Sequence, residues 1–170
     1  MASSGTAVVT LPSDTQIRIV REFDAPARHV FEAFTTPELV KRWWHAKRGT
    51  ATIADIDLRP GGTWRWVMVT DDGTEVAFHG EYREIVPGER LVYTEIFEMP
   101  GGADADAAVN TLTFEEHDGR TTLTSITETP SRELRDAIIA TGMEDGMQDA
   151  YDLLEEVAIS LASAREPAET

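Results

Sequence analysis

Two adjacent tryptophans, Trp43 and Trp44, lie in a short basic segment, residues 38–49, of an otherwise acidic chain. Aromatic rings among cationic side chains can bind single-stranded nucleic acid by stacking on its bases. However, Leu39, Val40 and the two tryptophans are spaced as one helical stripe, which is typical of a helix packed on a core. The basic side chains then point outward. We interpret the tryptophans first as core and second as the wall of a ligand pocket, and a pocket wall is itself core.

Further aromatic and methionine side chains could also surround an apolar ligand. Trp64, Trp66 and Met68 alternate on one face of a predicted strand. A C-terminal segment repeats three more such side chains at helical spacing: Met143, Met147 and Tyr151. Methionine is flexible and polarisable, which suits adaptable binding, although plain packing of strand on helix explains both stripes equally well.

Three titratable residues could by position bring acid–base chemistry to the interior, namely His79, Glu81 and Glu95. The sequence does not tell which face of the His79 strand is concave. An inward imidazole would need a partner such as Tyr93 or a ligand, because an unpaired polar group in an apolar cavity is costly. An outward imidazole would simply meet solvent, and both alternatives stay open.

Other reactive groups are excluded or unsupported. The chain has no cysteine, which excludes disulfides, thiolate catalysis and zinc sites built on cysteine. Its four histidines show no HxH or HExxH spacing, so no metal site is expected. Gly61–Gly62 and "PGG" at 100–102 are interpreted as turns, and neither is a phosphate loop, because no GK[ST] motif follows. We find no catalytic motif and expect no cofactor.

The charge balance limits the partners. Fifteen Lys and Arg residues stand against 31 Asp and Glu residues, a net charge of −16. Such a surface repels phosphate backbones and anionic lipid, so neither nucleic-acid nor membrane binding is expected. The N-terminal residues do not resemble a secretory signal, and no apolar run approaches the length of a membrane span. The expected location is the cytoplasm.

The elements that would position these side chains follow from changes in hydrophobic period. Residues 15–23 alternate as a strand, residues 24–36 and 36–44 form two short helices, and residues 131–162 form a long helical region with a break near Thr141. We interpret the acidic face of that last region as solvated surface. Six further strands joined by short turns are expected between these helices, at residues 51–58, 63–70, 75–86, 90–98, 108–117 and 120–128.

This order predicts an α+β domain in which a curved seven-stranded antiparallel sheet surrounds one long C-terminal helix. The two short helices, between the first and second strands, would close one end. We expect a single domain at residues 15–162, preceded by an N-terminal extension at 1–14. "VVTLP", residues 8–12, is a candidate extra strand within that extension. The ends of the chain, residues 1–6 and 163–170, are expected to be frayed.

Several motifs in this order resemble the SRPBCC (START-like) superfamily: "REFDAPARHVFEAFTTPELVKRWW", "LRPGGTWRWVM", "FHGEYREIVPGERLVYT" and "TGMEDGMQDAYDLLEEVA". Within it, the chain is similar to the branch named after the C-terminal domain of the activator of the heat-shock protein 90 ATPase. The resemblance implies a helix-grip fold with a deep cavity between the sheet and the long helix. The superfamily includes lipid carriers, plant allergens and aromatic polyketide cyclases, so the fold alone does not give the function.

We therefore predict that the cavity binds a small hydrophobic or aromatic molecule. The candidate ligand-binding residues are Trp43, Trp44, Trp64, Trp66, Met68, His79, Tyr93, Met143, Met147 and Tyr151. One alternative is an enzyme of the polyketide cyclase or hydrolase kind that uses polar groups of the cavity. A second alternative is a chaperone-linked interaction module. A homodimer formed through exposed apolar helix or edge-strand surface also stays open.

Overall fold

The structure is a computed structural model that describes residues 7–98 and 107–165. Of the ends predicted to be frayed, residues 1–6 and 166–170 lie outside the described residues. Residues 163–165 continue the last helix, which ends at Arg165, a little beyond its predicted end.

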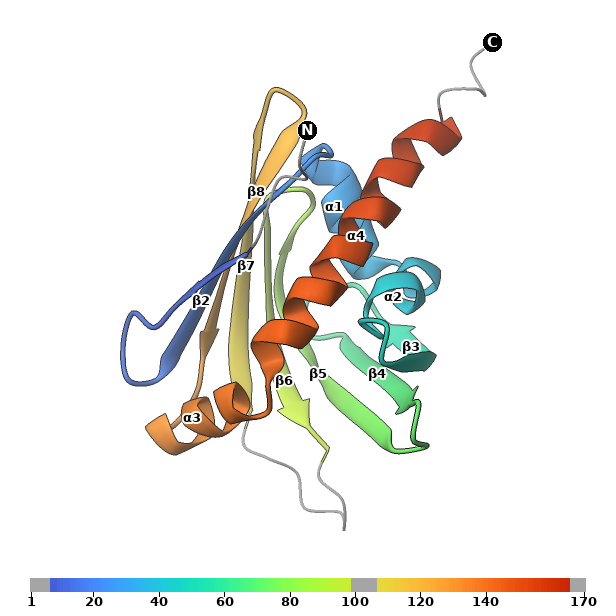
Figure 1. The fold of residues 1–170 in the computed structure, drawn as a ribbon. Coiled ribbons are helices and arrows are strands. Elements are labelled where there is room, and N and C mark those ends of the chain that lie inside the picture. Colours follow the sequence, from blue (N-terminus) through green and yellow to red (C-terminus); the bar gives the residue numbers. More distant parts are fainter. Residues whose placement is uncertain (1–6, 99–106, 166–170) are drawn as a thin grey trace.

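Eight strands form one antiparallel sheet (Figure 1). They are β1 (Val8–Thr10), β2 (Gln16–Phe23), β3 (Gly49–Ile56), β4 (Thr63–Thr70), β5 (Glu75–Val86), β6 (Arg90–Phe97), β7 (Ala108–His117) and β8 (Arg120–Glu128). Their order in the sheet is β1-β2-β8-β7-β6-β5-β4-β3. The seven predicted strands are present, and the candidate strand in "VVTLP" is the eighth, β1, which pairs with β2.

Within residues 7–98 and 107–165, four helices accompany the sheet: α1 (Ala27–Thr35), α2 (Pro37–Trp43), α3 (Arg132–Ala140) and α4 (Met143–Arg165). The Ser131 hydroxyl accepts a hydrogen bond from the Leu134 backbone amide at 3.1 Å and so caps α3. The predicted break is present, since Gly142 has a φ of +81° and separates α3 from α4. Glycine tolerates this left-handed conformation, which would strain other residues.

The core lies between the inner face of the sheet and α4, with α1 and α2 packed against that helix (Figure 1). Ile17, Ile19 and Phe23 alternate along β2 and are buried, as are Leu154 and Val157 of α4. Burying one such side chain contributes roughly 1.5–3 kcal/mol. None of the helices in the described residues is long and apolar enough to cross a membrane.

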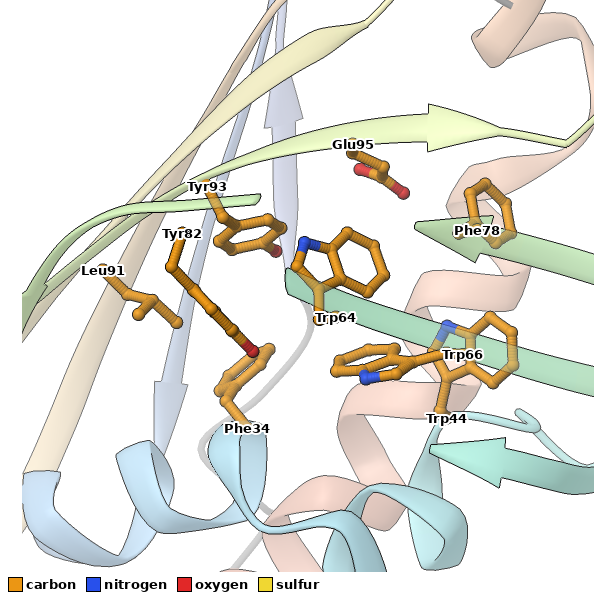
Figure 2. Close-up of a pocket in the computed structure, with 9 residues that line it drawn as sticks. All are labelled: Phe34, Trp44, Trp64, Trp66, Phe78, Tyr82, Leu91, Tyr93 and Glu95. Carbon is orange, nitrogen blue, oxygen red and sulfur yellow. The ribbon is translucent and has the colours of Figure 1, made fainter. Parts of the chain in front are cut away.

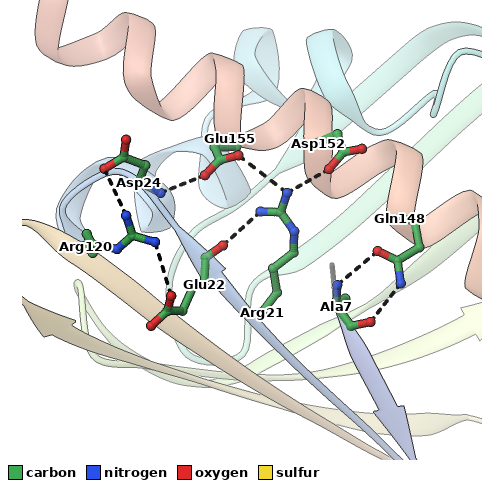
Figure 3. A network of polar contacts seen from close by, with 8 residues as sticks. All are labelled: Ala7, Arg21, Glu22, Asp24, Arg120, Gln148, Asp152 and Glu155. Atoms are coloured by element: carbon green, nitrogen blue, oxygen red, sulfur yellow. Dashed lines mark hydrogen bonds and ion pairs between the residues drawn. The ribbon is translucent and has the colours of Figure 1, made fainter. Parts of the chain in front are cut away.

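The remaining inward residue of β2 is charged: Arg21, between Ile19 and Phe23 on the same face, is 1% exposed. Its guanidinium donates to Asp152 at 2.7 Å and lies 3.5 Å from a Glu155 carboxylate oxygen (Figure 3). It also sits 4.6 Å from the centre of the Phe23 ring. Glu155 in turn accepts a hydrogen bond from the Asp24 amide at 2.8 Å. The interpretation of the acidic face of α4 as solvated surface is therefore wrong for Glu155, which is 6% exposed and fastens α4 to the sheet.

Candidate functional site

An internal pocket lies between the inner face of β4–β6 and the short helices, and we call it the aromatic pocket (Figure 2). Its volume is about 40 Å³. Side chains from α1, the end of α2 and three adjacent strands converge on it: Phe34, Trp44, Trp64, Trp66, Phe78, Tyr82, Leu91, Tyr93 and Glu95.

Strand alternation explains why these residues meet. Side chains two apart on a strand share a face, so Trp64 and Trp66 point the same way on β4. The antiparallel register then places Trp66 beside Phe78 and Tyr82 beside Tyr93. The inner face of three neighbouring strands thereby becomes almost wholly aromatic.

Gly80 makes room for this cluster. It pairs with Trp64 in the register, and a Cβ atom at this position would lie 2.8 Å from the Trp64 indole nitrogen and would also clash with the Thr94 carbonyl group. Because Gly80 has no Cβ atom, the Trp64 indole N–H can donate to the Thr94 carbonyl oxygen at 3.1 Å. A glycine is therefore needed here for the close approach of the indole ring, and its φ is not left-handed.

Neighbouring rings of the pocket wall contact each other edge to face, with steeply inclined ring planes. The Trp64 and Trp66 ring planes are inclined by 62° with centroids 5.2 Å apart, and those of Trp64 and Tyr93 by 88° at 5.6 Å. Trp44 meets Trp66 at 70° and 5.6 Å, and Phe78 at 85° and 5.9 Å. Such edge-to-face contacts each stabilise the cluster by about 0.5–1.5 kcal/mol beyond the burial of area.

One carboxyl group, that of Glu95, lines this aromatic pocket. Its Oε1 accepts a hydrogen bond from the Asn110 side-chain amide at 2.6 Å, and the Asn110 carbonyl oxygen accepts one from the Thr127 hydroxyl at 2.5 Å. Glu95 keeps some accessible surface, yet protein surrounds it closely enough that desolvation raises its pKa, which the Asn110 hydrogen bond partly offsets.

The phenols near Glu95 are perturbed as well. Burial raises the pKa of Tyr93 well above its ordinary value, and the neighbouring Glu95 charge adds to the rise. Burial also raises the pKa of Tyr151, again with a contribution from Glu95. Burial alone raises the pKa of Tyr82. All three phenols therefore stay protonated, so they can donate hydrogen bonds at neutral pH.

One polar group of the pocket wall has no hydrogen-bond partner among the described residues. The indole N–H of Trp66 is fully buried and makes no hydrogen bond within the described part of the chain. A buried donor left unpaired costs about 1–3 kcal/mol. An acceptor atom on a bound molecule would recover that cost.

The two adjacent tryptophans are divided between core and pocket. Trp44 lines the aromatic pocket and is half-buried. Trp43 is 3% exposed, donates its indole N–H to the Ala33 carbonyl oxygen at 2.9 Å and packs on Phe34 and Tyr151. Its polar group is satisfied, so Trp43 is core.

The ten candidate residues are thus only partly brought together. Trp44, Trp64, Trp66 and Tyr93 line the aromatic pocket. Tyr151 lies in the adjoining core, where its ring contacts those of Phe23, Phe34 and Trp43. Three methionines are not among the lining residues: Met143 and Met147 pack against the core from α4, and Met68 is half-buried further along β4.

His79 lies on the other face of the sheet, which resolves the question that the sequence left open. It alternates with Phe78 and Gly80, so its side chain points away from the aromatic pocket. Its Nδ1 lies 2.9 Å from an oxygen of Glu98, a carboxylate that Arg65 also binds at 2.8 and 2.9 Å. Hydrogen bonding to Arg65, joined by His79, lowers the pKa of Glu98 to about 2. His79 therefore belongs to an outer ionic cluster and not to the pocket.

Of the three titratable residues considered for acid–base chemistry, only Glu95 lines the pocket, since Glu81 is exposed on the same face as His79. The described residues contain no group of three His, Asp or Glu side chains that could hold a metal ion. Five lining residues were not among the ten candidates: Phe34, Phe78, Tyr82, Leu91 and Glu95. For Leu91 and Glu95, the sequence signal is their alternation with Tyr93 on β6, which places a carboxyl group on an otherwise apolar face.

Comparisons with known proteins agree with this architecture. A family model described as "Activator of Hsp90 ATPase homolog 1-like protein" matches residues 24–158. A comparison with curated proteins gave no match.

Solved bacterial structures share the fold over nearly the whole chain. A protein of Rhodobacter sphaeroides is 26% identical with a TM-score of 0.82, covering 94% of this chain and 99% of its own. A protein of Arthrobacter aurescens is 26% identical with a TM-score of 0.81, covering 90% and 91%. Protein Ms6760 of Mycobacterium smegmatis is 25% identical with a TM-score of 0.79, covering 89% and 96%.

Proposed function

Because this chain belongs to the family of activator of Hsp90 ATPase homolog 1-like proteins, which has the helix-grip fold, we propose that it binds a small hydrophobic or aromatic ligand in the aromatic pocket. The observation that carries the proposal is the composition of the pocket wall. Seven aromatic or phenolic rings surround a cavity that also contains a carboxyl group. Ligand sites are typically apolar, with a few convergent polar groups of this kind.

A pocket of this composition is unusual for simple packing. Close-packed interiors leave few voids larger than a water molecule. Carboxyl groups are rarely buried without a paired charge, because desolvation is costly. The aromatic pocket combines three unfavourable features: a cavity, the desolvated Glu95 carboxyl group and a Trp66 indole N–H that has no hydrogen-bond partner among the described residues. Costs of this kind concentrate at functional sites.

The ligand would enter by moving part of the wall. The cavity of about 40 Å³ is smaller than the roughly 150 Å³ of an apolar cavity that holds benzene. Trp44, Trp66 and Phe78 contact one another and are half-buried, whereas Trp64 is 4% and Tyr82 3% exposed. The half-buried side is therefore the one we propose to open, by rotation of the Trp44 side chain.

Thermal denaturation with indole or 3,3-dimethyl-1-butanol tests the proposal. A ligand that binds the native state alone raises the melting temperature, because it stabilises that state by mass action. We expect the rise for the unmodified protein and for Met68→Leu, which changes the same strand outside the pocket lining. Trp66→Leu removes a pocket wall and should abolish the rise. Absence of any rise with the unmodified protein, confirmed by native mass spectrometry, would contradict the proposal.

An enzyme is a second candidate, and Glu95 favours it. A desolvated carboxyl group with a raised pKa keeps its proton to a higher pH than an ordinary one, which suits a general acid. Incubation of a bound ligand with the protein, followed by mass spectrometry, should then yield a product with the unmodified protein and none with Glu95→Gln. An unchanged ligand in both samples would contradict the enzyme proposal and would leave ligand binding as the proposed function.

The family description also names activation of the Hsp90 ATPase, so an interaction with Hsp90 is a separate proposal for this chain. Measurement of the Hsp90 ATPase rate with and without the protein tests it, and an unchanged rate counts against it. A cytoplasmic location and a homodimer stay predictions. Cell fractionation and analytical ultracentrifugation check them.

A further inference from the structure

We propose that the ligand of the aromatic pocket carries a positively charged nitrogen, so that a substituted ammonium group binds among the rings beside Glu95. This inference rests on the proposed function and narrows its ligand class from any apolar molecule to a small organic cation.

The rings provide the first reason. The faces of aromatic rings are electronegative, and a cation within about 6 Å of a ring centre is attracted to them. Rings inclined by 62–88° to their neighbours form adjacent walls of a box, in contrast to a parallel stack. Trp64, Trp66 and Trp44 contribute three indoles, and tryptophan is the strongest partner for a cation. A box of this kind offers a cation several ring surfaces at once.

Glu95 provides the second reason. Asn110 holds its Oε1, and within the described part of the chain its Oε2 accepts no hydrogen bond. The nine lining residues include no lysine, arginine or histidine, so the pocket wall that the structure describes holds no counter-charge. An ionised Glu95 would gain its partner from the ligand. An anionic ligand would be repelled, and a neutral apolar one would leave the carboxylate unpaired.

The groups that face Glu95 from the packed elements do not compete for it. They are the Tyr93 phenol on its own strand, Asn110 on β7 and Tyr151 on α4. None of these is a cation. The net charge of −16 further favours the approach of a positively charged ligand.

Choline and 3,3-dimethyl-1-butanol form a matched pair of probes, because the alcohol has the same shape with a carbon atom in place of the charged nitrogen. In isothermal titration at pH 8 and constant ionic strength we expect choline to bind at least about tenfold more tightly. Lowering the pH through the pKa of Glu95 should weaken choline binding by up to about tenfold per pH unit, since the carboxyl group must lose its proton to pair. Binding of the alcohol should not weaken as the pH falls, because the neutral ligand gains nothing from the ionised carboxylate.

Two variants separate the carboxyl group of the pocket from the overall charge. Glu95→Gln should remove the preference for choline over the alcohol, and a cooperative thermal unfolding transition reports that the variant is folded. Glu81→Gln removes one negative charge from the exposed opposite face and should leave the preference for choline intact.

The outcomes distinguish the inference from the proposed function. Equal affinities for the two probes, or a choline preference that survives Glu95→Gln, would overturn the inference and leave a pocket for neutral ligands. Choline binding that survives Trp66→Leu would also overturn it, because the cation would then bind elsewhere. If neither probe nor indole binds, the proposed function fails as well.

Discussion

Two ionisable side chains, Arg21 on β2 and Glu95 on β6, lie on the inner face of the same sheet in opposite electrostatic environments. Arg21 is paired with Asp152 and Glu155 of α4, and it fastens the helix to the sheet (Figure 3). Glu95 lines the aromatic pocket (Figure 2). Its hydrogen-bond partner is the neutral side-chain amide of Asn110. Arg21, which has its counter-charges, stabilises the fold. Glu95 has no counter-charge in the described pocket wall, which is why we propose that a ligand supplies one.

The largest expected effect concerns the paired charge. Arg21→Met keeps an unbranched apolar stem but removes the buried guanidinium that Asp152 and Glu155 contact, so we expect the free energy of unfolding to fall by about 3–5 kcal/mol. Urea denaturation measures it. Asp152→Asn is the control, because the Asp152 side chain is 54% exposed and its loss should cost about 1 kcal/mol or less. Equal losses in the two variants would show that Arg21 does not depend on the buried carboxylate.

The next effect concerns the packing around the pocket. Gly80→Ala would place a methyl group against the Trp64 indole and the Thr94 backbone, and overpacking of this kind typically costs about 1–3 kcal/mol. Gly146→Ala is the control in α4, where nothing lies within 4 Å of the added carbon. That change should stabilise by up to about 1 kcal/mol. If Gly80→Ala were as stable as the unmodified protein, Trp64 would not be held as described.

The smallest effect concerns the unpaired charge without a ligand. The folded-state pKa of Glu95 is raised, so the folded protein holds the proton over a pH range in which the unfolded chain has lost it. Stability must then fall as pH rises from the ordinary carboxyl pKa through the raised one. Glu95→Gln lacks this loss, so its melting temperature relative to the unmodified protein should increase over that range and then level off.

The matched comparison for this effect is Glu81→Gln, which changes an exposed carboxyl group. Its melting temperature relative to the unmodified protein should not follow the same pH curve. A parallel curve for both variants would assign the effect to net charge rather than to the burial of Glu95.

Much of the fold could be predicted because local periodicity reports it. The alternation of Ile17 and Ile19 gave β2, and the glycine at 142 gave the break before α4. Arg21 shares the same alternating face, so its burial was readable from the stripe. Its partner Glu155 was not, because a carboxylate beside other acidic residues is usually solvated.

The site was less predictable, since it depends on which face of a strand meets the helices. His79 and Phe78 are adjacent in sequence, and only the packed sheet shows that Phe78 faces inward. Likewise, helical spacing could not separate Trp43 from Trp44, because the division depends on the Ala33 carbonyl group that satisfies one indole. The size of the cavity depends on side-chain rotamers, which no sequence pattern records.

Glu95 has no counter-charge in the described pocket wall, and our proposal that a cationic ligand supplies one has a direct test. Carbon-13 NMR of the glutamate side-chain carboxyl carbons, assigned with Glu95→Gln, measures its pKa directly. We predict a pKa above the ordinary glutamate value in the free protein and a lower one with saturating choline, but no such fall in the pKa with 3,3-dimethyl-1-butanol. An ordinary pKa in the free protein, or one that choline leaves unchanged, would contradict the account.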